Sequence, residues 1–441
     1  MFSSQLDRAR HPLSGRMRGF VLGTMLMIAA AAALVSPRTA AFTFWVTAVG
    51  FTVSGLWRRD IDWKELRPGP VAFSFAAFFG YALLSAAWAA HPSITAQKAG
   101  LGLLTAASAM LMVGLLQRET RPNLVHMGEG VVLGMLLGIA FLAVEVFGDQ
   151  PIKLAIYRAL ELRPADLRPE GFFVWKDNYL QSISPEDLTR NMTDAALFLW
   201  PAVMAALGVW WRFGRVTALV LAAVTVATIM GSKHASSQLA LLVGFAAFAL
   251  SRLSLRWTWR VTVVAWFGIC LAVMPLVFLA HRAELHEAEW LYPSARHRVI
   301  IWNYTAEKTL ESPWHGIGAN QTYLLGPSLE AQIPNFSSNP LARTLSIHAH
   351  NVYLQTWFEL GLIGALLLAA AGFFLLRAIR NLAPRLQPYG FATFASCAAM
   401  VSTSYGMWQV WLVTSLGLTA TLFAVGAQCL EGDAHPERTN D

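Results

Sequence analysis

Charged side chains are scarce in this chain of 441 residues: Asp, Glu, Lys and Arg make up 13% of it, and 56% of the residues are hydrophobic. An ordinary soluble domain carries roughly 25% charged residues. The shortage therefore excludes a soluble globular protein. Apolar runs long enough to cross about 30 Å of hydrocarbon recur along nearly the whole length. The composition predicts an all-α polytopic membrane protein, with one integral membrane domain over residues 1–441.

Cysteine is scarce as well. The three cysteines, Cys270, Cys397 and Cys429, lie within or at the end of apolar runs, so no disulfide framework supports the loops. The chain also lacks solenoid repeats and the glycine patterns of dinucleotide and P-loop sites, which argues against a cytoplasmic ATP-driven machine. The net charge of +7 does not indicate a nucleic-acid partner, because many Lys and Arg residues fall in short loops between apolar runs and are interpreted as topology signals.

Apolar windows predict about 12 transmembrane helices. Basic clusters such as Arg212/Arg215 and Arg377/Arg380/Arg385 all fall on one side of the membrane, which the positive-inside rule identifies as the cytoplasm. Both termini are then cytoplasmic, with a short polar tail over residues 430–441. The predicted spans lie near residues 19–36, 39–57, 70–90, 98–117, 127–148, 192–210, 216–231, 238–251, 261–280, 352–376, 387–405 and 408–427.

Two long segments are predicted on the non-cytoplasmic side, and each is expected to contain short helices. They are residues 149–190, called the first loop below, and residues 282–351, called the second loop. Arginines this dense in the second loop suit an anionic ligand such as a lipid-linked diphosphate, because a guanidinium can bind phosphate oxygens in a bidentate fork. A solvated basic loop is the alternative. In or beside the second loop lie His281, His286, His297, His315, His348 and His350, together with Arg282, Arg296, Arg298, Lys308 and Arg343.

Arg298 is the first-ranked cation of the second loop, because Trp302 follows it by one helical turn. The sequence Pro313-Trp314-His315-Gly316-Ile317-Gly318 then predicts a tight glycine turn. A further cation, Lys233, stands in the short link 232–237 on the same side of the membrane. Lys233 either meets an anionic ligand there or snorkels to the interface.

The sharpest local pattern is His350-Asn351, followed by nine residues and then by Gly361 and Gly364. A neutral imidazole at the mouth of a span can take a proton from a sugar hydroxyl as a general base. Asn351 is expected to hold the histidine or the substrate, and the two glycines to permit close helix approach that keeps the histidine on a rigid element. A purely structural histidine and glycines that serve packing alone are the alternative.

A metal site is the other way to use these histidines. His348 and His350 are two residues apart and His315 is a possible third ligand. The acidic residues of the loops form no DxD-like cluster that would hold a metal against a diphosphate. A positively charged site without metal or other cofactor is therefore the favoured prediction.

Together, His350-Asn351-x9-Gly361-x2-Gly364, Arg298-x3-Trp302 and Pro313-x2-Gly316-x-Gly318 resemble the motifs of the O-antigen ligase family and of the related O-antigen polymerases. The resemblance covers residues 189–364 in motifs and the whole chain in topology. Two positions depart from the family pattern. Arg190-Asn191 stands where relatives show Asn-Arg, and Lys233 stands where they typically show Arg, so it supplies a charge without the guanidinium fork.

The resemblance implies transfer of a preassembled O-antigen polysaccharide from undecaprenyl diphosphate to a sugar of the lipid A-core, with inversion and without a metal. The protein would then lie in the bacterial inner membrane with its active site on the periplasmic face. His350 would deprotonate the acceptor hydroxyl, while Arg298, Lys233 and Arg190 would bind the departing diphosphate. Asn351, His348, Gly361 and Gly364 would support the site.

Three alternatives remain open. An O-antigen polymerase shares these motifs but uses a second lipid-linked oligosaccharide as acceptor, and a protein O-oligosaccharyltransferase is a more distant relative in function. A transporter or flippase of lipid-linked sugars also suits about 12 spans, but carriers commonly use broken helices or polar residues near the midplane and show related halves. The sequence shows neither clearly, although Asp194 and Glu145 lie inside or near spans.

Overall fold

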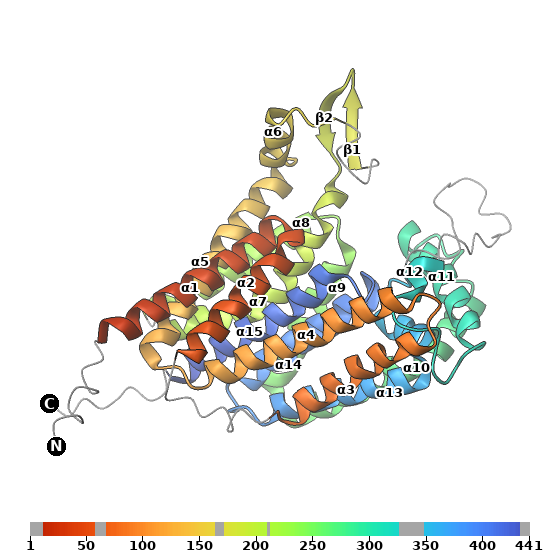
Figure 1. The fold of residues 1–441 in the computed structure, drawn as a ribbon. Coiled ribbons are helices and arrows are strands. Elements are labelled where there is room, and N and C mark those ends of the chain that lie inside the picture. The colour runs from red at the N-terminus through yellow and green to blue at the C-terminus, as the bar shows by residue number, and fades with distance from the viewer. Residues whose placement is uncertain (1–11, 58–67, 164–171, 210–211, 326–347, 433–441) are drawn as a thin grey trace. The chain divides into compact units, whose positions relative to one another are not determined.

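The computed structural model describes residues 12–57, 68–163, 172–209, 212–325 and 348–432. Within these ranges the chain is almost entirely helical (Figure 1), which confirms the prediction of an all-α polytopic membrane protein. Eleven helical stretches in the described ranges are long and apolar enough to cross a membrane. The twelfth predicted span coincides with α14 (Gln387–Thr403), whose 17 residues are at the lower limit for a transmembrane helix.

The chain divides into two compact units, which are described separately. Unit 1 comprises Met1–Leu66, Ala109–Leu242 and Thr414–Asp441, and unit 2 comprises Arg67–Ser108 and Val243–Val413. The helices of the N-terminal half are α1 (Pro12–Val35), η1 (Pro37–Thr39), α2 (Ala40–Leu56), α3 (Pro70–Leu84), η3 (Ser85–Ala87), α4 (Pro92–Leu116), α5 (Arg121–Phe147), α6 (Pro151–Ala159), η6 (Pro185–Leu188) and α7 (Thr189–Val209). Those of the C-terminal half are α8 (Gly214–Gly231), α9 (Ala235–Leu253), α10 (Leu255–Arg282), α11 (Pro293–Thr309), α12 (Gln321–Leu325), α13 (Val352–Arg380), α14 and α15 (Val410–Gly432).

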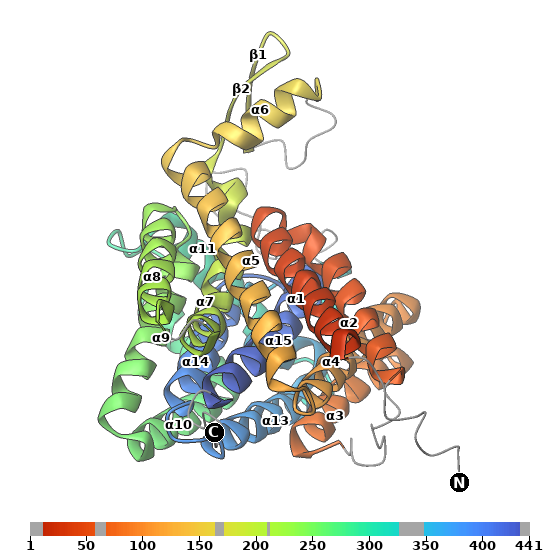
Figure 2. The same cartoon turned by 90° about the vertical axis from the view of Figure 1, so that its left-hand side faces the viewer.

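Unit 1 is built around α7, which packs against α5 and α8 and is buried along nearly its whole length. Helices α1 and α5 lie side by side (Figures 1 and 2). They approach closely because glycines face each other: a Cβ on Gly130 would overlap the backbone of Gly23. Small residues at helix contacts are the usual means of close packing in a membrane, where no hydrophobic effect drives helices together.

The first loop differs from the prediction of short helices alone. It contains α6 and η6, but also a hairpin of the antiparallel strands β1 (Phe173–Lys176) and β2 (Tyr179–Ile183). Asp177 and Asn178 join the strands, both with positive φ, as a two-residue turn of a twisted hairpin requires. Both views place α6 and the hairpin beyond the end of α5 (Figures 1 and 2).

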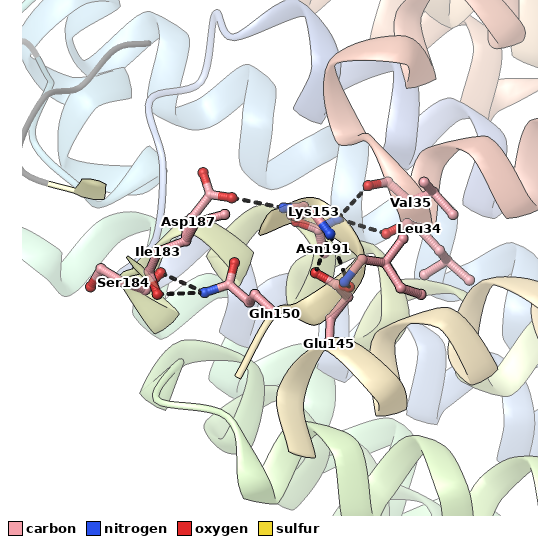
Figure 3. A network of polar contacts seen from close by, with 10 residues as sticks. Leu34, Val35, Glu145, Gln150, Lys153, Ile183, Ser184, Asp187 and Asn191 are labelled. Atoms are coloured by element: carbon pink, nitrogen blue, oxygen red, sulfur yellow. Dashed lines mark hydrogen bonds and ion pairs between the residues drawn. The ribbon is translucent and has the colours of Figure 1, made fainter. Parts of the chain in front are cut away.

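Polar contacts hold α6 to the rest of unit 1 (Figure 3). The Glu145 carboxylate, at the end of α5, accepts hydrogen bonds from the first-turn amides of Ile152 and Lys153, at 2.9 and 3.3 Å. A carboxylate suits this place because the N-terminal amides of a helix are unpaired and carry partial positive charge. The Lys153 ammonium forms an ion pair with Asp187 at 2.7 Å, which joins α6 to η6.

Unit 2 is built around α13, which packs against α3, α10, α11 and α14. Its core contains Trp266 of α10, whose indole N–H donates to the Ala369 carbonyl at 2.9 Å and whose ring packs edge-on against Tyr353 and Phe394. A Cβ on Gly372 would overlap this indole, so the glycine makes room for it. The large rings thus join α10, α13 and α14 into one body.

Candidate functional site

His350 stands immediately before α13, and the backbone around it is unusual. Its φ is +52°, a left-handed conformation that costs energy in a non-glycine residue and is common at functional sites. The next residue, Asn351, is the N-cap of α13, with its side-chain oxygen accepting from the Leu354 amide at 3.0 Å. The sequence suggested that Asn351 holds the histidine or the substrate. The structure gives it the role of fixing the helix start, and so the chain direction at His350.

The imidazole of His350 is oriented by a backbone carbonyl. Its Nδ1 lies 2.7 Å from the carbonyl oxygen of Ser404, in the segment 404–409 between α14 and α15. A carbonyl only accepts, so Nδ1 carries the proton and Nε2 the lone pair. Burial is the main cause that lowers the pKa of His350 to about 4; the hydrogen bond with Ser404 opposes this shift, and the neighbouring Arg298 and His297 add to it. The side chain is therefore neutral near pH 7 and able to accept a proton at Nε2.

Helix α11 brings Arg298 and Trp302 to this histidine. The two residues are one turn apart, and the Trp302 indole N–H donates to the Ala349 carbonyl at 2.8 Å, directly beside His350. Burial lowers the pKa of Arg298, and neighbouring Tyr405 opposes that shift, but an arginine remains charged in either case. The predicted Arg298-x3-Trp302 pattern thus provides both a cation near the imidazole and an anchor for its backbone.

His348 supports the same backbone. It is 7% exposed, its Nδ1 lies 3.3 Å from the His350 amide nitrogen, and the two rings meet edge to face at 4.1 Å. His315 contacts other groups: its Nδ1 lies 2.8 Å from the Gly316 carbonyl oxygen and its ring packs against Trp88. Throughout the part of the chain that the structure describes, no group of three His, Cys, Asp or Glu side chains is arranged to hold a metal ion.

Helix α13 is broken at Gly361, a feature that the sequence analysis did not identify. Gly361 has φ +64° and ψ −164°, and Gly316 of the turn 313–318 has φ +67°. A Cβ on Gly361 would overlap the backbone of Trp314, and one on Gly316 the backbone of Glu359. Both glycines are therefore required by close backbone contact and by their left-handed conformation. The close approach expected of Gly361 is to this turn rather than to another helix, and Gly364 follows one turn later, against Leu360.

The turn 313–318 pairs the backbone groups that the break leaves open. The amides of Ile317 and Gly318 donate to the carbonyls of Phe358 and Glu359, at 3.2 and 2.8 Å. Beyond the break, the amides of residues 362 and 363 donate to the carbonyls of residues 313 and 314, at 2.8 and 3.3 Å. Such pairing is necessary inside a membrane, where no water satisfies a broken helix. It also distinguishes this break from those of carriers, whose open helix ends face the ligand.

Glu359 is fully buried in α13 and was not among the predicted site residues. Its carboxylate accepts from the amides of Asn320 and Thr322, at 2.8 and 3.2 Å, from the Gln355 side chain at 3.0 Å, and from the indole of Trp408. Glu359 thus joins α13 to the segment after the glycine turn and to the segment 404–409. An acidic residue inside an apolar span is itself a sequence signal of a functional or structural polar site.

Lys98 was also missed. It lies on α4, seven residues into a candidate span, and lines a small pocket next to Trp408. Among the described residues the structure shows no hydrogen bond or ion pair of its ammonium group. The other lining residues are mainly apolar: Leu101, Gly102, Thr105, Trp408, Val410 and Val413.

The remaining predicted residues belong to unit 1. Arg190 is the second residue of α7 and half-buried, and the neighbouring Asn191 donates to the carbonyls of Leu34 and Val35 at the end of α1, at 2.7 and 3.0 Å (Figure 3). Lys233 is exposed in the turn between α8 and α9. The structure therefore brings His350, His348, Asn351 and Arg298 together in unit 2 and places Arg190 and Lys233 in unit 1. Arg343 lies outside the described residues.

Comparison with known proteins identifies related sequences over part of this chain. Residues 218–369 match the family model described as O-antigen ligase. A protein named "Putative polysaccharide ligase" from Rickettsia conorii is 31% identical over 125 residues, which is 28% of this chain and 30% of that protein. The protein of the same kind from Rickettsia typhi is 27% identical over 190 residues, 41% of this chain and 45% of that protein.

The matched regions thus cover less than half of these relatives' length. The family match includes Lys233, Arg298 and His350, and Arg190 lies before it. The resemblance to O-antigen ligases that the motifs indicated is confirmed over residues 218–369.

Proposed function

We propose that this protein is an O-antigen ligase, which transfers O-antigen polysaccharide from undecaprenyl diphosphate to the lipid A-core. The observation that carries the proposal is the position of Arg298 close to His350. His350 has its proton fixed on Nδ1 and its lone pair on Nε2, and the half-buried guanidinium of Arg298 lies near enough to lower its pKa. Together they offer a base for a hydroxyl and a cation for a phosphate. The family match over residues 218–369 supports the reaction class.

The proposed reaction is a single displacement at the anomeric carbon of the donor sugar. A hydroxyl oxygen of the lipid A-core attacks this carbon and forms the new glycosidic bond, and His350 Nε2 takes the hydroxyl proton. The bond from the anomeric carbon to the diphosphate oxygen breaks with inversion, and the bonding electrons leave with undecaprenyl diphosphate. Arg298 neutralises the charge that develops on this leaving group. A diphosphate is already a good leaving group, so cations can replace a general acid and no cofactor is needed in the proposal.

Lys233 and Arg190 are proposed as further diphosphate ligands, on the strength of the sequence patterns. The pocket around Lys98 supports a lipid-linked donor in a different way. A cation inside a membrane span is costly unless an anionic group meets it.

We also propose the bacterial inner membrane as the location, with both termini in the cytoplasm and His350 on the periplasmic face. The positive-inside distribution of Lys and Arg supports this orientation. It places the base on the side where an O-antigen ligase meets a flipped donor.

The test is reconstitution of the purified protein with undecaprenyl-diphosphate-linked polysaccharide, with and without lipid A-core, in the presence of EDTA. Polysaccharide should appear on the lipid A-core, and the rate should fall by about 10²–10⁴-fold in His350→Ala, which is the contribution typical of a general base. The control is Glu145→Gln, which changes a buried carboxylate of unit 1 and should leave transfer within about threefold.

The other results of this experiment are equally informative. Longer lipid-linked chains formed without lipid A-core would identify an O-antigen polymerase instead. A product that requires a divalent metal would overturn the proposed metal independence. Loss of all covalent product, together with movement of the lipid-linked polysaccharide between leaflets, would identify a transporter.

A further inference from the structure

Segment 404–409 supplies the carbonyl that orients His350, and it lies between two helices with, among the described residues, a single backbone hydrogen bond of its own, from the Gln409 amide to the Gly406 carbonyl at 3.3 Å. Two side chains of α13, Gln355 and Glu359, accept hydrogen bonds from its N–H groups. The Gln355 side-chain oxygen accepts from the Met407 amide at 3.1 Å, and the Glu359 carboxylate accepts from the Trp408 indole. Gln355 in turn donates to Glu359 at 3.0 Å. The buried Glu359 carboxylate therefore takes part in both attachments of the segment. It accepts directly from Trp408, and it accepts from Gln355, whose side-chain oxygen binds the Met407 amide.

We propose that Glu359 is a positioning residue, which holds segment 404–409 through Gln355 and Trp408 and so keeps the Ser404 carbonyl against Nδ1 of His350. Without that carbonyl the proton is no longer fixed on Nδ1, and Nε2 is no longer reserved as the base. Glu359 acts at a distance and does not contact the reacting atoms. Its effect on transfer rests on the proposed function, whereas its effect on His350 does not.

The isosteric change Glu359→Gln tests this geometry because the carboxylate only accepts. Four N–H donors face its two oxygens, two at each. A Gln amide must turn its NH2 group toward one pair. Facing Trp408, it leaves the indole unpaired. Facing Gln355, it forces that side chain to rotate its own amide and lose Met407. Segment 404–409 is loosened in either orientation.

The first readout is independent of transfer: the rate at which diethyl pyrocarbonate modifies His350 in the purified full-length protein, followed by mass spectrometry of the peptide. This reagent attacks neutral imidazole. We expect Glu359→Gln to raise the rate at His350 at least ~3-fold, because loss of the holding contacts opens a buried side chain. His126, in unit 1, is the internal standard and should react at an unchanged rate. An unchanged rate at His350 would overturn the proposal.

The second readout separates positioning from donor binding. In the reconstituted reaction, Glu359→Gln should lower kcat by at least ~10-fold and leave the KM for the donor within about threefold, because a misplaced base affects the chemical step. Glu145→Gln, the same exchange in unit 1, should change neither value. A rise in KM with kcat intact would refute positioning. If wild type transfers nothing while the labelling rates still differ, the proposed function fails and the positioning role stands.

Two milder variants cover the case that Glu359→Gln does not fold. Trp408→Phe removes one donor and keeps an aromatic ring against Phe79, and Gln355→Met removes the hold on Met407 at similar volume. Each should shift labelling and kcat in the same direction as Glu359→Gln, by a smaller factor. Thermal unfolding of each variant shows that it is folded. Folded variants with wild-type labelling and kcat would overturn the proposal.

Discussion

The first loop and the region around His350 both join membrane spans and both bury titratable side chains, but they do so in opposite ways. In the first loop, Glu145 meets the amides that begin α6, and Lys153 meets Asp187. Charges of opposite sign are satisfied inside the structure (Figure 3). Around His350, by contrast, Arg298 and His297 are cations or potential cations beside a base, and they lower its pKa.

This difference separates structural from functional polar groups. A network whose charges neutralise one another stabilises a fold and offers nothing to a ligand. Cations gathered beside a neutral imidazole have no anion to pair with in the protein alone, and a bound anion would supply one. We therefore predict that changes near His350 affect transfer more than stability, and that changes in the network of Glu145, Lys153 and Asp187 do the reverse.

Arg298→Ala gives the largest of the expected effects argued below. It should lower kcat/KM for transfer by about 10²–10³-fold, because a cation at a developing phosphate charge contributes this much. Arg298→Lys should recover about tenfold, since it keeps the charge and loses the fork. The control is Arg282→Ala, which removes an exposed cation of the second loop and should keep activity within about threefold. Equal losses in both would mean that only net charge matters.

The pH dependence of kcat/KM is the next effect. A base with a pKa of about 4 is neutral above this pH, so activity should persist through pH 5 and fall as the pH drops through about 4. Removing the Arg298 charge should move this acidic fall in kcat/KM to higher pH. Recovery of activity after return to pH 7 excludes denaturation as the cause. A limb near pH 6.5 in the wild type would show an unperturbed imidazole and contradict the burial of the site.

The same pKa shift has a consequence for stability. The unfolded chain takes up a proton at this histidine near pH 6.5, whereas the folded protein does so near pH 4. Its contribution to folding is therefore complete above pH 6.5 and is lost as the pH falls through this window.

The broken helix gives the third effect, on stability. Gly361→Ala should lower the free energy of unfolding by about 2 kcal/mol or more, because a left-handed φ is strained for alanine and its Cβ overlaps the Trp314 backbone. Gly268→Ala in α10 is the matched control, since open space surrounds that glycine and alanine favours a helix. Thermal unfolding in detergent measures both. If Gly361→Ala and Gly268→Ala unfold at the same midpoint temperature, the turn 313–318 does not need a glycine at position 361.

Much of this fold could be predicted from the sequence, and the reason is physical. Apolar runs must become helices in a membrane because only a helix pairs its own backbone there. The Arg298-x3-Trp302 pattern also carried over, since two residues one turn apart share a helix face. The hairpin of the first loop was missed although the sequence carries a local signal for it. Two short segments rich in aromatic and aliphatic residues flank Asp177-Asn178, and Asp and Asn are residues that favour a two-residue turn.

The rest of the candidate site depends on distant contacts. Ser404 lies 54 residues after His350, and Trp408 lies 49 residues after Glu359, so no local pattern announces either contact. Glu359 and Lys98 themselves were visible as charged residues in apolar runs. What the sequence could not show is which partners they have, and this decides whether a buried charge is structural or poised for a ligand.

Loss of the ion pair between Lys153 and Asp187 is expected to have the smallest effect on the free energy of unfolding. It also tests most directly whether this network is structural. The two side chains are 14% and 20% exposed, so Lys153→Met should lower the free energy of unfolding by about 1 kcal/mol, with Asp187 left unpaired. The double variant with Asp187→Asn should recover part of this loss. Transfer should stay within about threefold in both. Loss of transfer at normal stability would instead make Lys153 a ligand-binding cation, and would contradict the purely structural role of the network that it forms with Glu145 and Asp187.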